Sequence, residues 1–299
     1  MNDDIKVSIS CLTFNHEKYL IDCFEGFLKQ KCNFKFEVLI HDDCSTDRTI
    51  EIIESYQKKY PQIFKSYIQK ENQFSLGIRG LQYKYNFTRA KGKYIAICEG
   101  DDYWTDEFKL QKQYDFLERN SEYFTHCHNS QVIGLESRVF SNELNRDYMT
   151  KDVLGFRKFH TNSLFFRNEP NIFKNLIHFK PVLSGDKQFY IFLSTLGKIK
   201  YVDEIMSIYR KNDFGLSLNV DYNKLKYDFN IIDNLHDILT KDQIVILINN
   251  VFYTSRKYTV IKMTILEKLN LAYRYLFYKY QYSKINFADI KQIINYLRP

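Results

Sequence analysis

Four residues that could bind a metal ion and a diphosphate follow directly after an apolar segment. Glu99-Gly100-Asp101-Asp102 comes after Tyr94–Cys98, whose side chains predict a buried strand. Carboxylates at the carboxyl end of a strand can hold Mg²⁺ or Mn²⁺, and such an ion neutralises a diphosphate leaving group. The glycine lets a ligand approach the backbone. The alternative is a solvated acidic turn, and the position after a buried strand favours the binding site.

A second polar group, His41–Asp47, also follows a predicted strand. Asp42 and Asp43 can accept a hydrogen bond from a ring N–H of a nucleobase. The alternative is that all these residues cap the next helix, a role that we assign to Thr46 and Asp47. A third polar segment, 12–17, follows the first predicted strand. Three such loops predict one ligand crevice at the carboxyl ends of the strands.

These loops need a parallel sheet to position them. Apolar, β-branched segments alternate with helical patterns over residues 1–120, as βαβ units require. The predicted strands are Ile5–Leu12, Phe36–His41, Phe64–Gln69, Tyr94–Cys98, Thr125–Ile133, Thr161–Arg167, Lys198–Val202 and Ile205–Tyr209. The predicted helices are Tyr19–Gln30, Asp47–Tyr60, Glu107–Arg119 and Asp186–Leu196, followed by a helical pattern from about Tyr222. The fold class is therefore α/β, with a mostly parallel central sheet flanked by helices and a C-terminal helical extension.

The bulk composition indicates a folded protein. The chain has 299 residues, of which 44% are hydrophobic and 17% aromatic, enough for one large domain with an appendage. The formal net charge of +7 comes from the residues after Val251, which include nine basic and two acidic side chains. The six cysteines contain no C-x-x-C pair, which predicts free thiols in a reducing compartment. An acidic N-terminus and the lack of an apolar run of about 18 residues predict a cytoplasmic protein.

Together the motifs resemble family 2 glycosyltransferases with the GT-A fold, particularly bacterial enzymes of capsule, O-antigen and exopolysaccharide assembly. The resemblance covers about Lys6 to Ser217. It rests on Thr13-Phe14-Asn15-His16-Glu17-Lys18-Tyr19-Leu20, on the D-D-x-S-x-D loop at Asp42, on Glu99-Gly100-Asp101-Asp102 as the D-x-D motif, on Ser184-Gly185-Asp186-Lys187, and on Tyr209-Arg210 with Gly215 and Ser217.

The resemblance implies a role for each matching residue. The donor would be bound by Thr13, Phe14, Asn15, Glu17, Asp42, Asp43, Arg79, Glu99, Asp101 and Arg210. Asp102 and Asp101 would coordinate Mg²⁺ or Mn²⁺, and the sugar or acceptor would contact Trp104 and Asn162. Asp186 would be the general base, taking the proton of the acceptor hydroxyl as it attacks the anomeric carbon opposite the diphosphate, with inversion.

Several of these residues have a structural alternative. Arg79 can be a surface arginine, Trp104 can simply pack, and the segment around Asn162 can begin a strand. Asp186 suits the N-cap of the helix that follows it. Asn212 stands where the late motif often has His, so metal coordination would rest more heavily on Asp102 and the diphosphate itself.

The implied reaction is an inverting transfer of a hexose or N-acetylhexosamine from a UDP-sugar to a saccharide acceptor linked to undecaprenyl diphosphate, in bacterial surface polysaccharide biosynthesis. The expected catalytic domain is 1–218, with a nucleotide-sugar half at 1–105 and an acceptor half at 106–218. A sugar nucleotidylyltransferase and a non-catalytic nucleotide-binding module are the alternatives, although segment 12–17 lacks the Gly-rich basic loop of the former.

The expected C-terminal extension, 219–299, combines basic residues with an aromatic stripe at three- and four-residue steps: Leu266, Leu269, Tyr273, Leu276, Phe277 and Tyr280. This pattern predicts peripheral contact with the inner face of the cytoplasmic membrane. A solvated helix face or a dimer contact are the alternatives, and a homo-oligomer stays open. No RNA-binding motif accompanies the basic residues, so no nucleic-acid partner is expected.

Overall fold

The chain forms two compact units, seen in a computed structural model that describes residues 4–212, 220–257 and 263–297. The first unit comprises 1–148, 158–179 and 196–212. The second comprises 149–157, 180–195 and 213–299. Two segments of the expected acceptor half thus cluster with the C-terminal helices, and the boundary expected at residue 218 stays a prediction.

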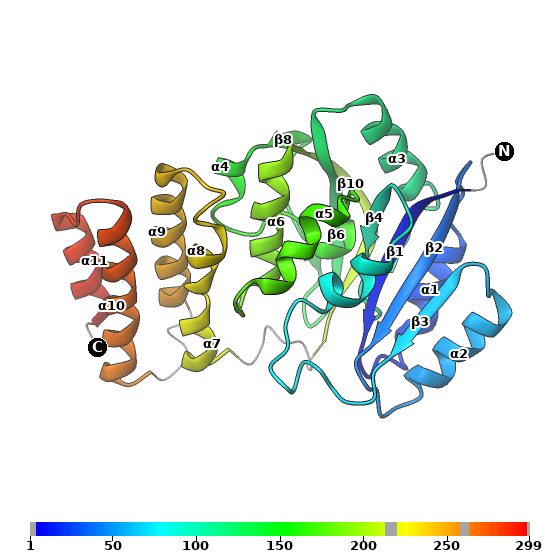
Figure 1. The fold of residues 1–299 in the computed structure, drawn as a ribbon, viewed down its shortest axis with the longest axis horizontal. Coiled ribbons are helices and arrows are strands. Elements are labelled where there is room, and N and C mark those ends of the chain that lie inside the picture. The colour runs from blue at the N-terminus through cyan, green and yellow to red at the C-terminus, as the bar shows by residue number, and fades with distance from the viewer. Residues whose placement is uncertain (1–3, 213–219, 258–262, 298–299) are drawn as a thin grey trace. The chain divides into compact units, whose positions relative to one another are not determined.

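One mixed sheet forms the centre of the first unit (Figure 1). Its strand order is β3-β2-β1-β4-β9-β6-β10-β5, and β7 and β8 pair with β6 and β10. Neighbours among β1 to β4 are parallel, as are β6 and β10, whereas β9 runs antiparallel to β4 and β6. The predicted α/β class with a mostly parallel sheet is confirmed. The strands are β1 Ile5–Thr13, β2 Lys35–Asp42, β3 Phe64–Ile68, β4 Tyr94–Ile97, β5 Tyr103–Trp104, β6 Tyr123–Gly134, β7 Arg138–Val139, β8 Arg146–Tyr148, β9 Phe165–Arg167 and β10 Lys198–Lys211.

Helices cover this sheet, and α2 lies beside the strand β3 (Figure 1). Alternate residues of β1, including Val7 and Ile9, pack in one core cluster with Phe24 and Phe27 of α1, because successive side chains of a strand point to opposite faces. The helical segments of this unit are α1 Leu20–Leu28, α2 Thr49–Lys59, η1 Gln82–Asn86, η2 Phe87–Arg89, α3 Lys109–Arg119, η3 Thr161–Ser163, α5 Pro170–Phe173 and η4 Lys174–His178.

The opposite face of β1 is polar and still buried. Ser8 Oγ donates to Glu37 at 2.7 Å, and Asn86 Nδ2 donates to Ser10 Oγ at 3.0 Å. Gly92 N donates to Ser8 Oγ at 2.9 Å, and a Cβ at Gly92 would lie 2.5 Å from Ser8 N. These bonds fix the segment before β4, and hence the strand that leads into the acidic loop.

Two predicted elements differ from the structure. The expected strand Thr161–Arg167 is divided, because η3 occupies its first part and only Phe165–Arg167 joins the sheet. The two expected strands between Lys198 and Tyr209 are one strand, β10, whose register against β6 shifts after Val202 and after Ile205. These irregularities explain the break in the sequence pattern.

The second unit is helical, and α9 and α11 both contact α10 (Figure 1). The α10 helix begins with a capping box in which Thr264 and Glu267 bond each other's backbone N–H. Its inner face is buried, and its outer face exposes an apolar stripe. The helices are α4 Thr150–Val153, α6 Gly185–Leu196, α7 Tyr222–Tyr227, α8 Asn230–Leu235, α9 Lys241–Lys257, α10 Ile265–Tyr282 and α11 Phe287–Leu297, with Leu196 counted in the first unit. The exposed stripe is Leu266, Leu269, Tyr273, Phe277 and Tyr280.

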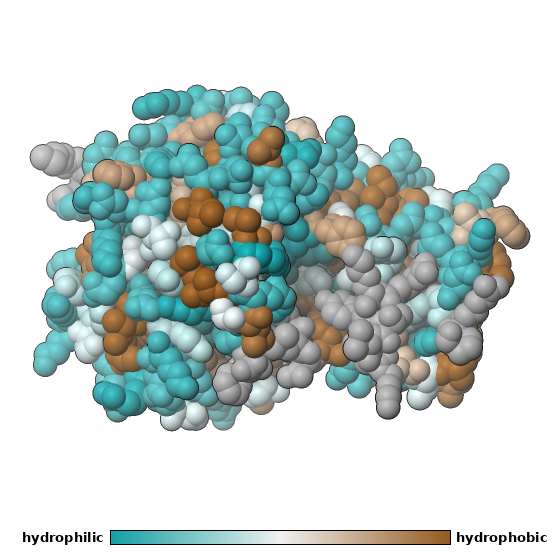
Figure 2. Space-filling model, turned by 180° about the vertical axis from the view of Figure 1, so that it is seen from behind, coloured by the Kyte–Doolittle hydropathy of each residue, from teal (hydrophilic) through white to brown (hydrophobic). Residues whose placement is uncertain are grey.

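Hydrophobic side chains reach the surface among hydrophilic ones on the face drawn in Figure 2. Over residues 4–212, 220–257 and 263–297, no helix is both long and apolar enough to cross a membrane. All six cysteines are free, as the sequence predicts.

Candidate active site

Hydrogen bonds join the polar loop after β1, the first loop, to the polar loop after β2, the second loop. Thr13 Oγ1 donates to Asp42 Oδ2 at 2.8 Å. Ser45 donates to the same carboxylate twice, from N at 2.8 Å and from Oγ at 2.6 Å. Asp42 is fully buried and already has three donors. The bonds of Asp42 therefore shape the loop, and its carboxylate does not face an open cavity.

Asn15 and Glu17 bind the segment that leads into α2. The backbone of Asn15 has a φ of +54°, in the left-handed region that Asn tolerates, and its Oδ1 accepts from Thr46 N at 2.8 Å. Glu17 Oε2 accepts from Arg48 N at 3.0 Å. The N-cap position of α2 is Arg48 rather than the predicted Thr46 or Asp47, although Asp47 Oδ1 accepts from Thr49 N, in the first turn, at 2.9 Å. The first loop thus satisfies donors at a helix N-terminus.

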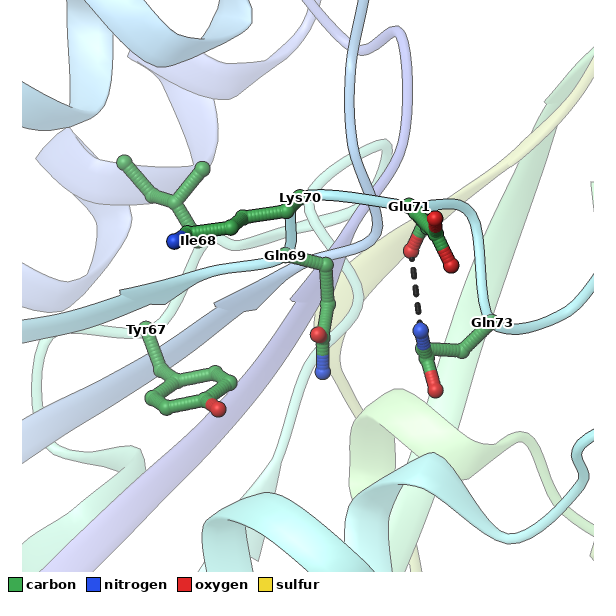
Figure 3. Close-up of a pocket in the computed structure, with 6 residues that line it drawn as sticks. All are labelled: Tyr67, Ile68, Gln69, Lys70, Glu71 and Gln73. Atoms are coloured by element: carbon green, nitrogen blue, oxygen red, sulfur yellow. Dashed lines mark hydrogen bonds between the residues drawn. The ribbon is translucent and has the colours of Figure 1, made fainter.

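Asp43 joins the second loop to the segment after β3. Its two carboxylate oxygens accept from the backbone of Gln73, at 2.8 Å, and Phe74, at 3.0 Å. That segment borders a cavity of about 530 Å³ (Figure 3), within the size range of small-molecule pockets. In Figure 3 the side chains of Tyr67 and Gln69 point to one side of β3 and that of Ile68 to the other. The cavity is lined by Tyr67, Ile68, Gln69, Lys70, Glu71 and Gln73.

An aromatic stack that was not predicted includes Tyr67, which lines this cavity. The ring of His41 stacks on Tyr85 at 4.4 Å and on Tyr67 at 6.2 Å between centroids. Its Nε2 lies 3.0 Å from Gln69 Nε2. Burial lowers the pKa of His41 to about 4, so the ring is neutral at physiological pH. The sequence placed His41 after a strand, but Tyr85 comes from a distant segment with no local signal.

The acidic loop after β4 packs tightly against the first loop. A Cβ at Gly100 would lie 2.7 Å from Thr13 Cγ2, 2.9 Å from His16 Nδ1 and 3.0 Å from Leu20 Cδ1. These distances are shorter than ordinary van der Waals contact, so only glycine fits without a shift of its neighbours. The acidic loop and the loop after β1 therefore meet, as the sequence predicts.

Asp101 and Asp102 lie in different environments. Asp101 is partly exposed, and its Oδ2 accepts from Asn212 Nδ2 at 3.3 Å. Asp102 is 1% exposed, and its oxygens accept from Arg210 N at 2.9 Å and Asn162 Nδ2 at 3.0 Å. Burial raises the pKa of Asp102 well above its usual range, and the charges of Asp101 and Glu99 raise it further.

Arg210 lies beside the acidic loop, as the late motif predicts. Its Nη1 donates to Asp101 O at 3.0 Å, and its guanidinium carbon lies 4.3 Å from the ring centroid of Tyr103 and 5.3 Å from that of Tyr19. Nη2 pairs with Asp22 of α1, a partner that the sequence did not suggest. The cation is thus held between the backbone of the acidic loop and the carboxylate of Asp22.

Trp104 and Asn162 are interior residues in this structure. Trp104 is 3% exposed, donates from Nε1 to Asn162 O at 2.9 Å, and has Lys109 Nζ 4.0 Å from its ring centroid. Asn162 Oδ1 accepts from Ser130 and Ser207, each at 3.0 Å. This geometry favours the packing alternative for Trp104. Asn162 contacts the acidic loop through its hydrogen bond to Asp102, and its role in binding a sugar or acceptor stays a prediction.

Three other predicted donor residues lie at the edges of the loops. Arg79 folds back on its own loop, with its guanidinium carbon 3.8 Å from the ring centroid of Phe74 and Nη1 donating to Phe74 O at 2.8 Å. Phe14 is exposed. Glu99 Oε2 accepts from Thr161 Oγ1 at 3.2 Å.

Asp186 belongs to the second unit and lies in the first turn of α6. Its Oδ2 pairs with Arg157 Nη1 at 2.6 Å, and its Oδ1 accepts from Lys187 N at 2.9 Å. The backbone of Ser184 begins the helix, since its carbonyl accepts from Gln188 N at 3.0 Å. The predicted Gly215 and Ser217 lie outside the described residues.

The acidic loop fits a divalent ion that takes most of its ligands from a diphosphate. Among the residues described, no three His, Cys, Asp or Glu side chains gather as a metal cluster. Mg²⁺ is commonly held by one or two carboxylates together with substrate phosphates, which requires no such cluster. Asp101 offers an accessible carboxylate, whereas the oxygens of Asp102 already have protein donors.

The fold and this loop arrangement define a GT-A-like α/β protein. The chain matches glycosyl transferase family 2 over residues 8–214 and belongs to that family. Rv1520, an uncharacterised protein of Mycobacterium tuberculosis, is 34% identical over 214 residues, which are 70% of this chain and 60% of that protein. The poly(ribitol-phosphate) β-N-acetylglucosaminyltransferase TarS of Staphylococcus aureus is 31% identical over 104 residues, 34% of this chain and 17% of TarS. The chain therefore spans only part of the length of these relatives.

Solved structures show the same fold. TarS residues 1–349, in complex with UDP-GlcNAc, align with a TM-score of 0.61 and 18% identity, covering 98% of this chain and 79% of the other. The mannosyltransferase PcManGT of Pyrobaculum calidifontis, in complex with GDP-Man and Mn²⁺, aligns with a TM-score of 0.54 and 11% identity, covering 99% and 86%.

Proposed function

We propose that this protein transfers a hexose or N-acetylhexosamine from a UDP-sugar to a saccharide acceptor of a bacterial surface polymer. The observation that carries the proposal is the partly exposed Asp101 at the carboxyl edge of a family 2 sheet, where its backbone carbonyl accepts from Arg210 and its carboxylate accepts from Asn212. TarS, a relative with the same fold, is named for N-acetylglucosaminyl transfer to poly(ribitol phosphate), which supports an N-acetylhexosamine donor and a surface-polymer acceptor.

The residues of the first unit would divide the work of donor binding. Asp43 lies at the edge of the cavity along β3. Its carboxylate would accept a hydrogen bond from the nucleobase once the bonds from Gln73 N and Phe74 N are broken. The conformation of the loops is stabilised by the hydrogen bonds of Thr13, Asn15, Glu17 and Asp42. Arg210 orients the diphosphate by charge-assisted hydrogen bonds.

Mg²⁺ or Mn²⁺, held by Asp101, would neutralise charge on the departing diphosphate. PcManGT, a structure with the same fold, contains Mn²⁺, which supports this cofactor class. Asp102 positions the loop backbone through its bonds to Arg210 N and Asn162, and thereby the Asp101 carboxylate.

Asp186 is the proposed general base. Its carboxylate removes the proton of the acceptor hydroxyl as that oxygen attacks the anomeric carbon, which inverts the configuration. Arg157 Nη1 pairs with its Oδ2 at 2.6 Å, which holds the carboxylate in one orientation at the start of α6.

The test is a panel of UDP-, GDP- and dTDP-sugars assayed for release of nucleoside diphosphate with Mg²⁺, with Mn²⁺ and with EDTA. We expect turnover of a UDP-sugar with either ion and none with EDTA. Asp186→Asn should lose turnover by about a hundredfold or more while UDP binding is kept, since general-base catalysis contributes on that order. Turnover of no nucleotide sugar would refute the function, and full turnover by Asp186→Asn would refute the base.

A further inference from the structure

The loop before Asp186 is held by side chains from beyond residue 220, all within the second unit. Asp228 lies between α7 and α8, and its carboxylate accepts from Ser184 N at 2.9 Å and from Ser184 Oγ at 3.2 Å. Because the Ser184 carbonyl starts α6, these two bonds fix the first turn of the helix that carries Asp186.

Two asparagines extend this contact along the loop. Asn234 Oδ1 accepts from Lys180 N at 2.8 Å, and its Nδ2 donates to Lys180 O at 2.9 Å and to Gln188 Oε1 at 2.6 Å. Asn230 Nδ2 donates to Pro181 O at 2.7 Å. One side chain thus bonds both the N–H and the carbonyl of a single residue, which fixes the direction of the chain as well as its position.

Because Asp228 is buried, loss of its hydrogen bonds would destabilise the loop before α6. Asp228 is 3% exposed, and the ammonium of Lys187 is also buried near both Asp228 and Asp186. Burial raises the pKa of Asp228, while Lys187 and the bonds from Ser184 act in the opposite direction. Removing the carboxylate would leave Ser184 N and Ser184 Oγ without their acceptor and would take a nearby negative charge from the buried Lys187.

We propose that Asp228 and Asn234 are positioning residues for Asp186. They hold the backbone of 180–184 so that the carboxylate of Asp186 keeps its place at the start of α6. The family match ends at residue 214, so it assigns these residues no role. The inference rests on the proposed function of Asp186 as general base. Under this proposal, α8 and the turn before α8 help to position the general base.

The test compares Asp228→Ala, Asn234→Ala and Asp228→Asn in the full chain, using the UDP-sugar of highest turnover in the panel. We expect each alanine variant to lower kcat by about tenfold or more while the KM for the UDP-sugar is unchanged, because the donor residues lie in the first unit. Asp228→Asn keeps an acceptor for Ser184 N and should restore kcat to within about threefold. Asp237→Ala, at an exposed position of the same unit, is the control and should match the wild type.

Hydrogen–deuterium exchange of the peptide 180–188 gives a second readout. We expect Asp228→Ala to speed its exchange by about tenfold or more, and Asp237→Ala to leave it unchanged. If Asp228→Ala does not fold, Asn234→Ala decides both measurements. Loss of turnover in Asp186→Asn with full turnover in the two alanine variants would overturn this inference alone. Full turnover by Asp186→Asn would overturn it together with the proposed base.

Discussion

Replacement of Lys109 by methionine tests how much the burial of a lysine charge in α3 lowers the free energy of unfolding. Lys109 is fully buried in α3, with Nζ donating to Gln113 Oε1 at 2.7 Å and lying over the ring of Trp104. Burial lowers its pKa from 10.5 to about 7. The difference, 10.5 minus 7, is 3.5 units, which at about 1.36 kcal/mol per unit is roughly 5 kcal/mol against the charged form in the folded protein.

The sign of the pH dependence follows from proton binding. Between about pH 7 and pH 10.5 the unfolded chain keeps this proton and the folded chain does not, so the free energy of unfolding rises with pH over that range. The unfavourable contribution is complete below about pH 7 and is absent above pH 10.5. Methionine removes this unfavourable contribution of the buried charge. It also leaves Gln113 Oε1 without its donor, at a cost of about 1–3 kcal/mol, and it loses the cation–π contact with Trp104.

We therefore expect Lys109→Met to be more stable than the wild type by about 1–3 kcal/mol near pH 6, an advantage that falls by about 4 kcal/mol toward pH 10. Urea unfolding followed by circular dichroism at several pH values measures the difference in the free energy of unfolding between the two proteins. Lys112→Met is the control, because Lys112 lies on the same helix with a partly exposed side chain and surface ion pairs. Parallel curves for Lys109→Met and the wild type across this range would refute the buried, neutral lysine.

Three other substitutions test separate features. Gly100→Ala should weaken UDP binding by about tenfold or more, since its Cβ would overlap Thr13 and displace the acidic loop; calorimetric affinity equal to that of the wild type would contradict this packing. Cys44→Gly should raise the free energy of unfolding by about 0.5–1 kcal/mol, because Cys44 has a φ of +66°, and a lower urea midpoint would count against it. Serine at Tyr273 and Phe277, on the exposed stripe of α10, should abolish flotation with anionic liposomes, and equal flotation of variant and wild type would exclude that surface as the membrane contact.

Much of the fold follows from the sequence because its strands are locally encoded. The strand β1 combines an apolar face with a polar one, and α1 and α2 begin within two residues of where the spacing predicts them. The two-residue strand β5 escaped prediction, since it exists only through pairing with β10, about a hundred positions later. The first part of Thr161–Arg167 forms η3, in which Asn162 N bonds His160 Nδ1 and Ser163 Oγ bonds His160 O.

The candidate site was predictable at the level of loops but not of individual bonds. Convergence of the three loops follows from parallel strand ends, and the structure brings Thr13, Asp42 and Gly100 together. Asp102 and Asp101 differ because the carboxylate of Asp102 accepts a hydrogen bond from the backbone of β10. That bond joins residues more than a hundred positions apart, so the sequence carries no local signal for it. The partner of Arg210, Asp22, has no sequence signal for the same reason.

A calorimetric titration of UDP in the presence of Mn²⁺, with wild type and Asp101→Asn, tests the central claim that the edge of the sheet beside Asp101 is a donor site. The wild type should bind UDP more tightly with Mn²⁺ than with EDTA. The variant should lose that gain, a change of about tenfold or more, or roughly 1.4 kcal/mol, because it lacks the accessible carboxylate. Equal Mn²⁺-dependent affinity in both proteins would contradict the account.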